Sequence, residues 1–312
     1  MLGQTFHDFE LIIIDDCSDD DSLAIIESFD DHRVRLLKSS ERLGICKALN
    51  LGIENSRGSF LARMDADDIC HPRRLERQVR FLNRHTKIGF CGTWVRRFGK
   101  DQIPQLYRLP VGESRVRAYA AFENPMVHSS VMFRREVFDS MPNGYRHDFI
   151  NAEDYDLWTR LFEVTKGDNL AEVLLDYRVH AQSVTMQKTE AMDQVACRIL
   201  ERELGRLGVE PTEAELKFHR LWSTGRLASE DYLQEMKSIE RWLIRLNEAN
   251  KRSKAFDTAA FLWASREIWF GLCYRIQALG HPVLKRFFQS PLSRGDLKSG
   301  AILMAAKAKR ML

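Results

Sequence analysis

Three carboxylates gather in a short turn early in this chain. The segment Met64-Asp65-Ala66-Asp67-Asp68 follows the apolar run Ser59–Ala62. Carboxylates this close repel one another and lose hydration unless a cation or a set of hydrogen-bond donors compensates them. Hard oxygen ligands at the end of a strand suit Mg²⁺ or Mn²⁺, and such ions are often shared with substrate phosphates. The plain alternative is an Asp-rich turn that caps the next helix.

Two further acidic pairs stand at the ends of expected elements. Asp15-Asp16 close the apolar run Phe9–Ile14, which predicts a buried, parallel strand. Glu153-Asp154 open a segment with helical spacing through Leu161. Acidic residues favour the first turn of a helix through its dipole, so capping is the plain explanation for this second pair.

The expected elements place the first two acidic groups together. Residues 20–29 and 44–55 have helical spacing and alternate with the first three expected strands. Strands are expected at residues 9–14, 34–37, 59–64, 87–98, 129–133 and 173–179. The βαβαβ alternation predicts an α/β fold with a mostly parallel sheet flanked by helices. Ligands of such sheets bind beyond the carboxyl ends of the strands, where both acidic groups would lie.

Composition excludes several classes of protein. The 312 residues are 29% charged and 44% hydrophobic, which predicts a packed core rather than disorder. A net charge of +3 gives no argument for nucleic-acid binding. The six cysteines form no C-x-x-C pair, which argues against a zinc site or disulfide scaffold and indicates a reducing compartment. No signal peptide and no uninterrupted apolar run long enough to span a bilayer are expected.

The motifs, taken in order, resemble those of inverting family-2 glycosyltransferases of the GT-A fold. Each motif alone is weak, but together in the correct order over about residues 2–187 they are specific. The segments that carry the resemblance are Asp15–Asp20 ("VDDxSxD"), Leu43–Gly52 ("xxG…ALNxG"), Met64–Asp68 (DxD), Pro72–Gln78, Glu153–Trp158 ("ED") and Tyr177–Val184 ("YRxHxxS").

The resemblance implies a nucleotide-diphosphate sugar as donor and a divalent metal, Mn²⁺ or Mg²⁺, as cofactor. It assigns Asp67 as the direct metal ligand and Asp65 to the donor ribose or the surroundings of the metal, and leaves Asp68 without a defined role. Asp15 is expected to hold the nucleotide base. His180 is a candidate ligand of the metal or diphosphate, against the alternative of an ordinary packed histidine. Arg63 is a candidate for neutralising phosphate charge, with a structural role as the alternative.

Inversion at the anomeric carbon requires a base on the side of the acceptor hydroxyl. Asp154 is the candidate for that base, with Glu153 as the second choice, and Asp156 is expected to be structural. His128 is expected to be structural or near the acceptor. The reaction implied is a single displacement without a covalent enzyme intermediate. A glycan or lipid-linked glycan of a bacterial surface polysaccharide is the acceptor that the resemblance suggests.

The start of the chain departs from the family pattern. Relatives begin with a strand of the form "VSVIIPxYN", whereas Met1–Phe6 resembles the end of the helix that follows that strand. The domain is therefore expected to be N-terminally truncated, with an exposed sheet edge. Two alternatives to an active glycosyltransferase stay open: a nucleotidyltransferase with similar carboxylate–metal chemistry, and an inactive truncated glycosyltransferase acting as a binding module.

Residues 1–187 are predicted to form the glycosyltransferase domain and residues 188–312 a helical extension. The extension is a candidate for covering the acceptor site, for a homodimer contact, or for a membrane surface through its basic stretch Lys298–Arg310 and the aromatic residues around Trp263. The expected location is cytoplasmic, with peripheral attachment to the inner face of the plasma membrane as an alternative. No nucleic-acid partner is expected.

Overall fold

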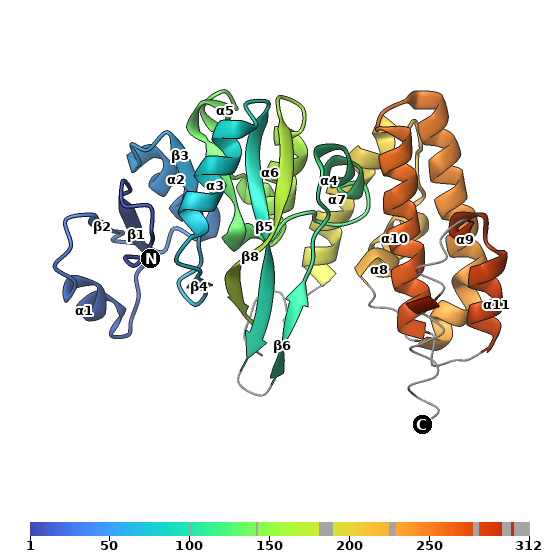
Figure 1. The fold of residues 1–312 in the computed structure, drawn as a ribbon, viewed down its shortest axis with the longest axis horizontal. Coiled ribbons are helices and arrows are strands. Elements are labelled where there is room, and N and C mark those ends of the chain that lie inside the picture. The colour runs from blue at the N-terminus through green and yellow to red at the C-terminus, as the bar shows by residue number, and fades with distance from the viewer. Residues whose placement is uncertain are drawn as a thin grey trace. The chain divides into compact units, whose positions relative to one another are not determined.

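The computed structural model describes most of the chain as two compact units (Figure 1). The described residues are 1–99, 102–141, 143–180, 190–224, 229–276, 281–294 and 301–302. The first unit comprises Met1–Glu113 and Pro125–Val195, and the second comprises Ser114–Asn124 and Ala196–Leu312. The predicted domain boundary after residue 187 lies outside the described residues.

The first two strands form a small parallel sheet of their own. Strand β1 (Leu11–Asp15) pairs in parallel with β2 (Val34–Lys38), and the short helix α1 (Ser22–Glu27) connects them. The strand, helix and strand expected here are therefore present. The expectation of a buried β1 was wrong, because its four apolar residues are only half-buried. Among the described strands β1 has one hydrogen-bonded neighbour, so its apolar run is covered incompletely.

The other strands make a six-stranded mixed sheet in the order β3-β7-β5-β8-β4, with β6 paired to β5. Their bounds are β3 Phe60–Ala62, β4 Ile69–Cys70, β5 Ile88–Gly99, β6 Gln102–Tyr107, β7 Met132–Arg134 and β8 Lys166–Arg178. Of the described pairings in this sheet only β5–β8 is parallel.

The prediction of a mostly parallel sheet was therefore wrong, although the α/β class and the flanking helices are confirmed. The alternation of elements predicted that the third strand would join the first two. Instead β3 pairs antiparallel with β7, which lies about seventy residues further along the chain. Local periodicity identifies a strand but carries no information about such a distant partner.

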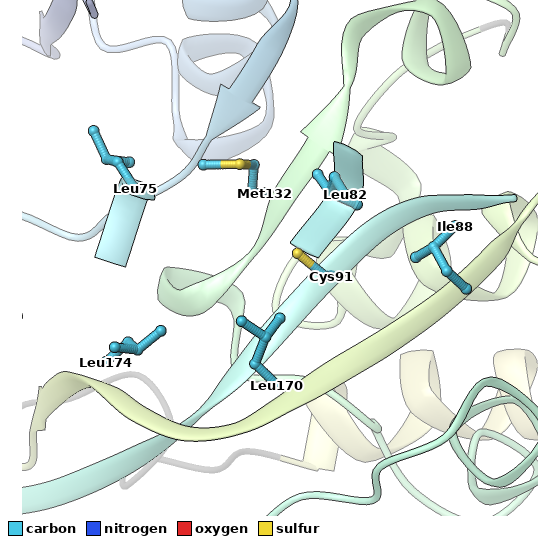
Figure 2. Packing of buried hydrophobic residues seen from close by; sticks show 7 residues of the cluster. All are labelled: Leu75, Leu82, Ile88, Cys91, Met132, Leu170 and Leu174. Atoms are coloured by element: carbon cyan, nitrogen blue, oxygen red, sulfur yellow. The ribbon is translucent and has the colours of Figure 1, made fainter. Parts of the chain in front are cut away.

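Helices pack on the mixed sheet through an apolar cluster (Figure 2). The helices and 3₁₀ turns of this unit are α2 Ile45–Asn55, α3 Arg74–Arg84, η1 His128–Ser130, α5 Arg135–Asp139, η2 His147–Phe149 and α6 Glu153–Leu161. Leu75 and Leu82 lie two turns apart on α3 and are both buried, as their spacing predicts. Figure 2 shows them beside Met132 of β7 and Cys91 of β5, so the core joins α3 to the centre of the sheet.

The second unit is helical in the residues that the structure describes. It contains most of α4 (Glu113–Tyr119), the part of α7 (Glu190–Arg206) from Ala196 onward, and α8 Glu213–Thr224, α9 Ser229–Ser253, α10 Thr258–Ile276, α11 His281–Gln289 and η4 Pro291–Ser293. The basic stretch from Lys298 lies largely outside the described residues. Among the described helices, none combines the length and apolar character that crossing a bilayer requires.

Candidate active site

The turn between β3 and β4 brings three carboxylates together. One oxygen each of Asp65, Asp67 and Asp68 lies within 4.8 Å of the others. Asp68 is buried, whereas the side chains of Asp65 and Asp67 are partly exposed. The chain thus holds an acidic cluster that is open to solvent on one side, as the DxD resemblance implies.

Asp65 is held by two donors from different parts of the chain. Its Oδ2 accepts hydrogen bonds from Nη1 of Arg63 and from Oγ of Ser129, both at 2.5 Å. The same Arg63 nitrogen also donates to Ser129 Oγ at 2.9 Å. The Arg63 side chain is only 10% exposed, so its charge compensates the cluster with little screening by water.

The end of β8 holds the other two carboxylates. The Arg178 main-chain N–H donates to Asp68 Oδ1 at 2.8 Å, and its Nε donates to the main-chain oxygen of Asp67 at 2.7 Å. Nε2 of His180 lies 3.3 Å from Asp67 Oδ2. The structure therefore brings His180 to the residue assigned as metal ligand, across more than a hundred residues of sequence.

The cluster fits a divalent cation. Asp68 Oδ2 is buried without a hydrogen-bond partner in the described part of the chain, an arrangement that costs free energy unless a ligand approaches. Burial raises the pKa of Asp68, and the charges of Asp65 and Asp67 raise it further. Carboxylate oxygens with one imidazole form a donor set suited to Mn²⁺ or Mg²⁺. The motifs assigned no defined role to Asp68. Its burial follows from the pairing of the next strand, β4, with β8, which local sequence patterns do not record.

Asp15 and Asp16 lie at the end of β1, on the small sheet. Asp15 is buried, and its Oδ1 accepts a long hydrogen bond of 3.4 Å from the Ser18 N–H. Asp16 accepts from the N–H groups of Leu43 and Gly44, which fixes the turn into α2. Asp16 thus has a structural role in this turn. No hydrogen bond or ion pair between described residues joins Asp15 to the 65–68 cluster.

Glu153 and Asp154 form the first turn of α6 and differ in exposure. Glu153 is buried, and its Oε2 has no hydrogen-bond partner among the described residues. Burial, followed by the neighbouring charge of Asp154, raises the pKa of Glu153 to about 7. Asp154 is half-buried, and its Oδ1 accepts from the Tyr155 N–H at 2.7 Å. Asp156 is fully buried in ion pairs with Arg146 and Arg160, which agrees with its expected structural role.

The 3₁₀ turn η1 contributes residues that the motifs did not single out. Ser129 binds Asp65, and no spacing signal could have connected two residues 64 positions apart. His128 Nε2 lies 2.8 Å from the Tyr145 hydroxyl, and burial together with the charge of Arg63 lowers the pKa of His128. The His128 ring meets the fully buried Trp158 edge-on, so Trp158 is a core residue.

A cavity of about 660 Å³ lies beside Tyr145. It is lined by Asn50, Ile53 and Glu54 of α2, Phe138 of α5, and residues 143–148. Asn50 fixes residues 143–148, because its side chain donates to the main-chain oxygen of Tyr145 and accepts from the Tyr145 N–H, both at 2.9 Å.

Comparisons with known proteins identify the family of this chain. The model of the family described as "Glycosyl transferase family 2" matches residues 1–141. The O-antigen biosynthesis glycosyltransferase WbnJ of Escherichia coli is 33% identical over 192 residues, which are 59% of this chain and 73% of WbnJ. The chain belongs to glycosyltransferase family 2. The order of motifs that suggested this family is thereby confirmed, and the nucleotidyltransferase alternative loses its support.

Two further comparisons show how far the likeness of this family-2 glycosyltransferase to other proteins extends. The amylovoran biosynthesis glycosyltransferase AmsE of Erwinia amylovora is 34% identical over 149 residues, 47% of this chain but only about half, 55%, of AmsE. The crystal structure of S. aureus TarS 1–349 in complex with UDP-GlcNAc aligns over 99% of this chain and 85% of that chain. Its TM-score is 0.54 and its identity 14%, so this likeness concerns the fold and confirms the predicted class.

Proposed function

We propose that this chain transfers a sugar from a nucleotide-diphosphate sugar to a hydroxyl of an acceptor glycan or lipid-linked glycan, with inversion and with a divalent cation. The observation that carries the proposal is that one family-2 domain contains two different acidic sites. One is a carboxylate cluster that fits a cation, and the other is an acidic pair at the start of α6. The names of AmsE and WbnJ, which refer to amylovoran and O-antigen biosynthesis, support a surface polysaccharide as product.

On the donor side, Asp67, Asp65 and His180 would hold the cation, and the unpartnered Asp68 Oδ2 is a further ligand. When bound, the cation neutralises the charge that develops on the departing nucleoside diphosphate. Arg178 keeps Asp67 and Asp68 in place through its main chain and guanidinium. Asp15, at the carboxyl end of β1, remains the proposed contact to the nucleotide base.

On the acceptor side, we assign the base to Asp154 rather than Glu153. A base must touch the acceptor hydroxyl, and Asp154 is the more accessible of the two. Glu153 is buried beside it, and its raised pKa keeps it partly protonated near neutral pH. A protonated Glu153 places no second negative charge beside Asp154. Proton transfer to Asp154 then accompanies attack on the anomeric carbon, opposite the leaving group.

The second unit is proposed to contact the acceptor, a second copy of the chain, or the membrane. Tyr274 and Phe288 are exposed aromatic residues on α10 and α11, at 45% and 53%. Such residues suit the inner face of the plasma membrane, where lipid-linked acceptors and cytoplasmic nucleotide sugars meet. We accordingly propose a cytoplasmic location. Vesicle binding tests whether the chain also contacts the membrane, and sedimentation tests whether it forms a homodimer.

The experiment that tests the proposed reaction is donor turnover by the purified chain. A panel of UDP- and GDP-sugars is incubated with Mn²⁺, with Mg²⁺ or with a chelator, and release of nucleoside diphosphate is followed. We expect release from one donor that the chelator abolishes, and an inverted anomeric centre in the product by NMR. Pyrophosphate release from a nucleoside triphosphate would contradict the proposal. Donor binding without any turnover would favour the binding-module alternative.

A further inference from the structure

Three consecutive side chains of η1 bind three different parts of the first unit. His128 reaches the Tyr145 hydroxyl, and Ser129 reaches Asp65. Ser130 binds only main chain, because its Oγ donates to the Val127 oxygen and accepts from the Thr93 N–H. Ser129 and Ser130 are both fully buried. The two serines therefore share their burial and differ in whether they contact a carboxylate of the candidate site.

Arg63 completes the contact between Ser129 and Asp65. Its Nη1 donates to both, at 2.5 Å from Asp65 Oδ2 and 2.9 Å from Ser129 Oγ. Its main chain is fixed at both ends, since the N–H donates to the Val131 oxygen and the carbonyl accepts from Arg74 Nη2 at 2.7 Å. The backbone from which the guanidinium reaches Asp65 is therefore held in place, and the side chain is only 10% exposed.

Helix α3 braces the turn from the other side. Gln78 Nε2 donates to the main-chain oxygens of Ser130 at 2.9 Å and Cys91 at 3.1 Å. Gln78 also accepts from Arg74 Nε at 2.9 Å, and both side chains are fully buried. The donors that hold Asp65 thus rest on the packed core of the unit rather than on a surface loop.

We propose that Ser129 and Arg63 are positioning residues that fix Asp65 for binding of a divalent cation together with a nucleoside diphosphate. The proposal rests on the function proposed above. Both donors take Oδ2 of Asp65, and Oδ1 has no hydrogen-bond partner in the described part of the chain. A carboxylate held by one oxygen offers the other in a single orientation, which lowers the entropy lost when the ligand binds. Arg63 also offsets the mutual repulsion of the three carboxylates before a cation arrives.

The neighbouring serines supply a matched pair of variants. Ser129→Ala removes a hydrogen bond to a carboxylate, whereas Ser130→Ala removes the same atom from a main-chain contact one residue away. The full-length chain is titrated with Mn²⁺ in the presence of UDP or GDP, and free Mn²⁺ is followed by electron paramagnetic resonance. We expect about 10-fold weaker Mn²⁺ binding for Ser129→Ala, the size of one hydrogen bond to a charged group, and a change below about twofold for Ser130→Ala.

A second pair of variants tests Arg63 and does not depend on the folding of the serine variants. Arg63→Lys keeps the charge and Arg63→Met removes it at similar length. We expect Arg63→Lys to bind Mn²⁺ more tightly than Arg63→Met, with the thermal unfolding temperature measured for every variant. In turnover assays the KM for Mn²⁺ should rise more than kcat falls, because the two residues act on binding of the cation.

The outcomes separate the positioning role from the proposed function. Equal Mn²⁺ binding by the unaltered chain and Ser129→Ala, or equal losses in Ser129→Ala and Ser130→Ala, would overturn the positioning role alone. Equal binding by Arg63→Lys and Arg63→Met would do so for Arg63. If the unaltered chain binds no Mn²⁺ with either nucleotide, the metal-dependent function falls and the positioning role falls with it.

Discussion

The two acidic clusters of this domain differ in how many of their carboxylates reach solvent. At the 65–68 turn, Arg63 and Ser129 donate to the partly exposed Asp65, and the Arg178 N–H donates to the buried Asp68. At the start of α6, Glu153 is buried and one of its oxygens has no partner among the described residues. Donors and open space favour ionised groups that can bind a cation, whereas burial favours a protonated one. This difference is the basis of the proposal that the first cluster binds a cation and the second takes part in proton transfer.

Replacing the proposed base is expected to have the largest effect. Asp154→Asn removes the proton acceptor without changing size, so kcat should fall by about 10²–10⁴-fold while Mn²⁺ binding is retained. Steady-state kinetics and the Mn²⁺ titration measure the two quantities on one preparation. Asp139→Asn, at an exposed carboxylate at the end of α5, is the control. Loss of Mn²⁺ binding in Asp154→Asn would contradict the proposal that Asp154 acts as the base and the 65–68 cluster binds the cation.

Replacing a carboxylate of the turn is expected to act on the cation. Asp67→Asn should weaken Mn²⁺ binding by more than about 100-fold, because it removes a charged ligand and the contact to His180. Saturating Mn²⁺ should restore part of the activity of Asp67→Asn. It should not restore the activity of Asp154→Asn at any concentration. Asp31→Asn, which breaks a surface pair with Arg33, is the control. An unchanged Mn²⁺ affinity in Asp67→Asn would remove that residue from the metal site.

The buried carboxyl of Glu153 predicts a stability that depends on pH. Its pKa is about 7 in the folded chain against an ordinary value of 4.5, so the folded chain binds more protons between these values. The free energy of unfolding should therefore fall as the pH rises from about 4.5 to 7, by on the order of 3 kcal/mol. Glu153→Gln cannot ionise and should lack this part of the slope. Denaturant unfolding at pH 5 and pH 8 measures it, and parallel slopes for both chains would contradict the burial argument.

The contact of His180 with the 65–68 carboxylate cluster is expected to contribute least. His180 lies 3.3 Å from Asp67 and is 45% exposed, so His180→Ala should weaken Mn²⁺ binding by about 10-fold. His32→Ala, at a histidine that is 94% exposed, is the matched control. An effect no larger than that of the control would make His180 an ordinary surface residue, which was the alternative to its role as ligand.

Local elements were predictable because their signals are local. The run 9–14 and the spacing of 44–55 gave β1 and α2 within about two residues of their bounds. The sheet was predicted less well, because β3 pairs with β7 and not with the small sheet. Strand pairing depends on contacts between distant segments, which periodicity does not record. For the same reason, the motifs located Asp65 but not its partner Ser129, which is part of η1 and not of the acidic motif.

The sequence by itself determined the family, the α/β class and the residue types of both acidic clusters. These follow from order and spacing along the chain, which folding does not alter. Only the tertiary structure decided the state of each carboxyl group. Donor contacts from β8 and η1 hold the 65–68 turn and leave Asp65 and Asp67 partly exposed, whereas Glu153 is buried. The charge of a carboxyl group depends on its surroundings in space, and distant parts of the chain supply those surroundings.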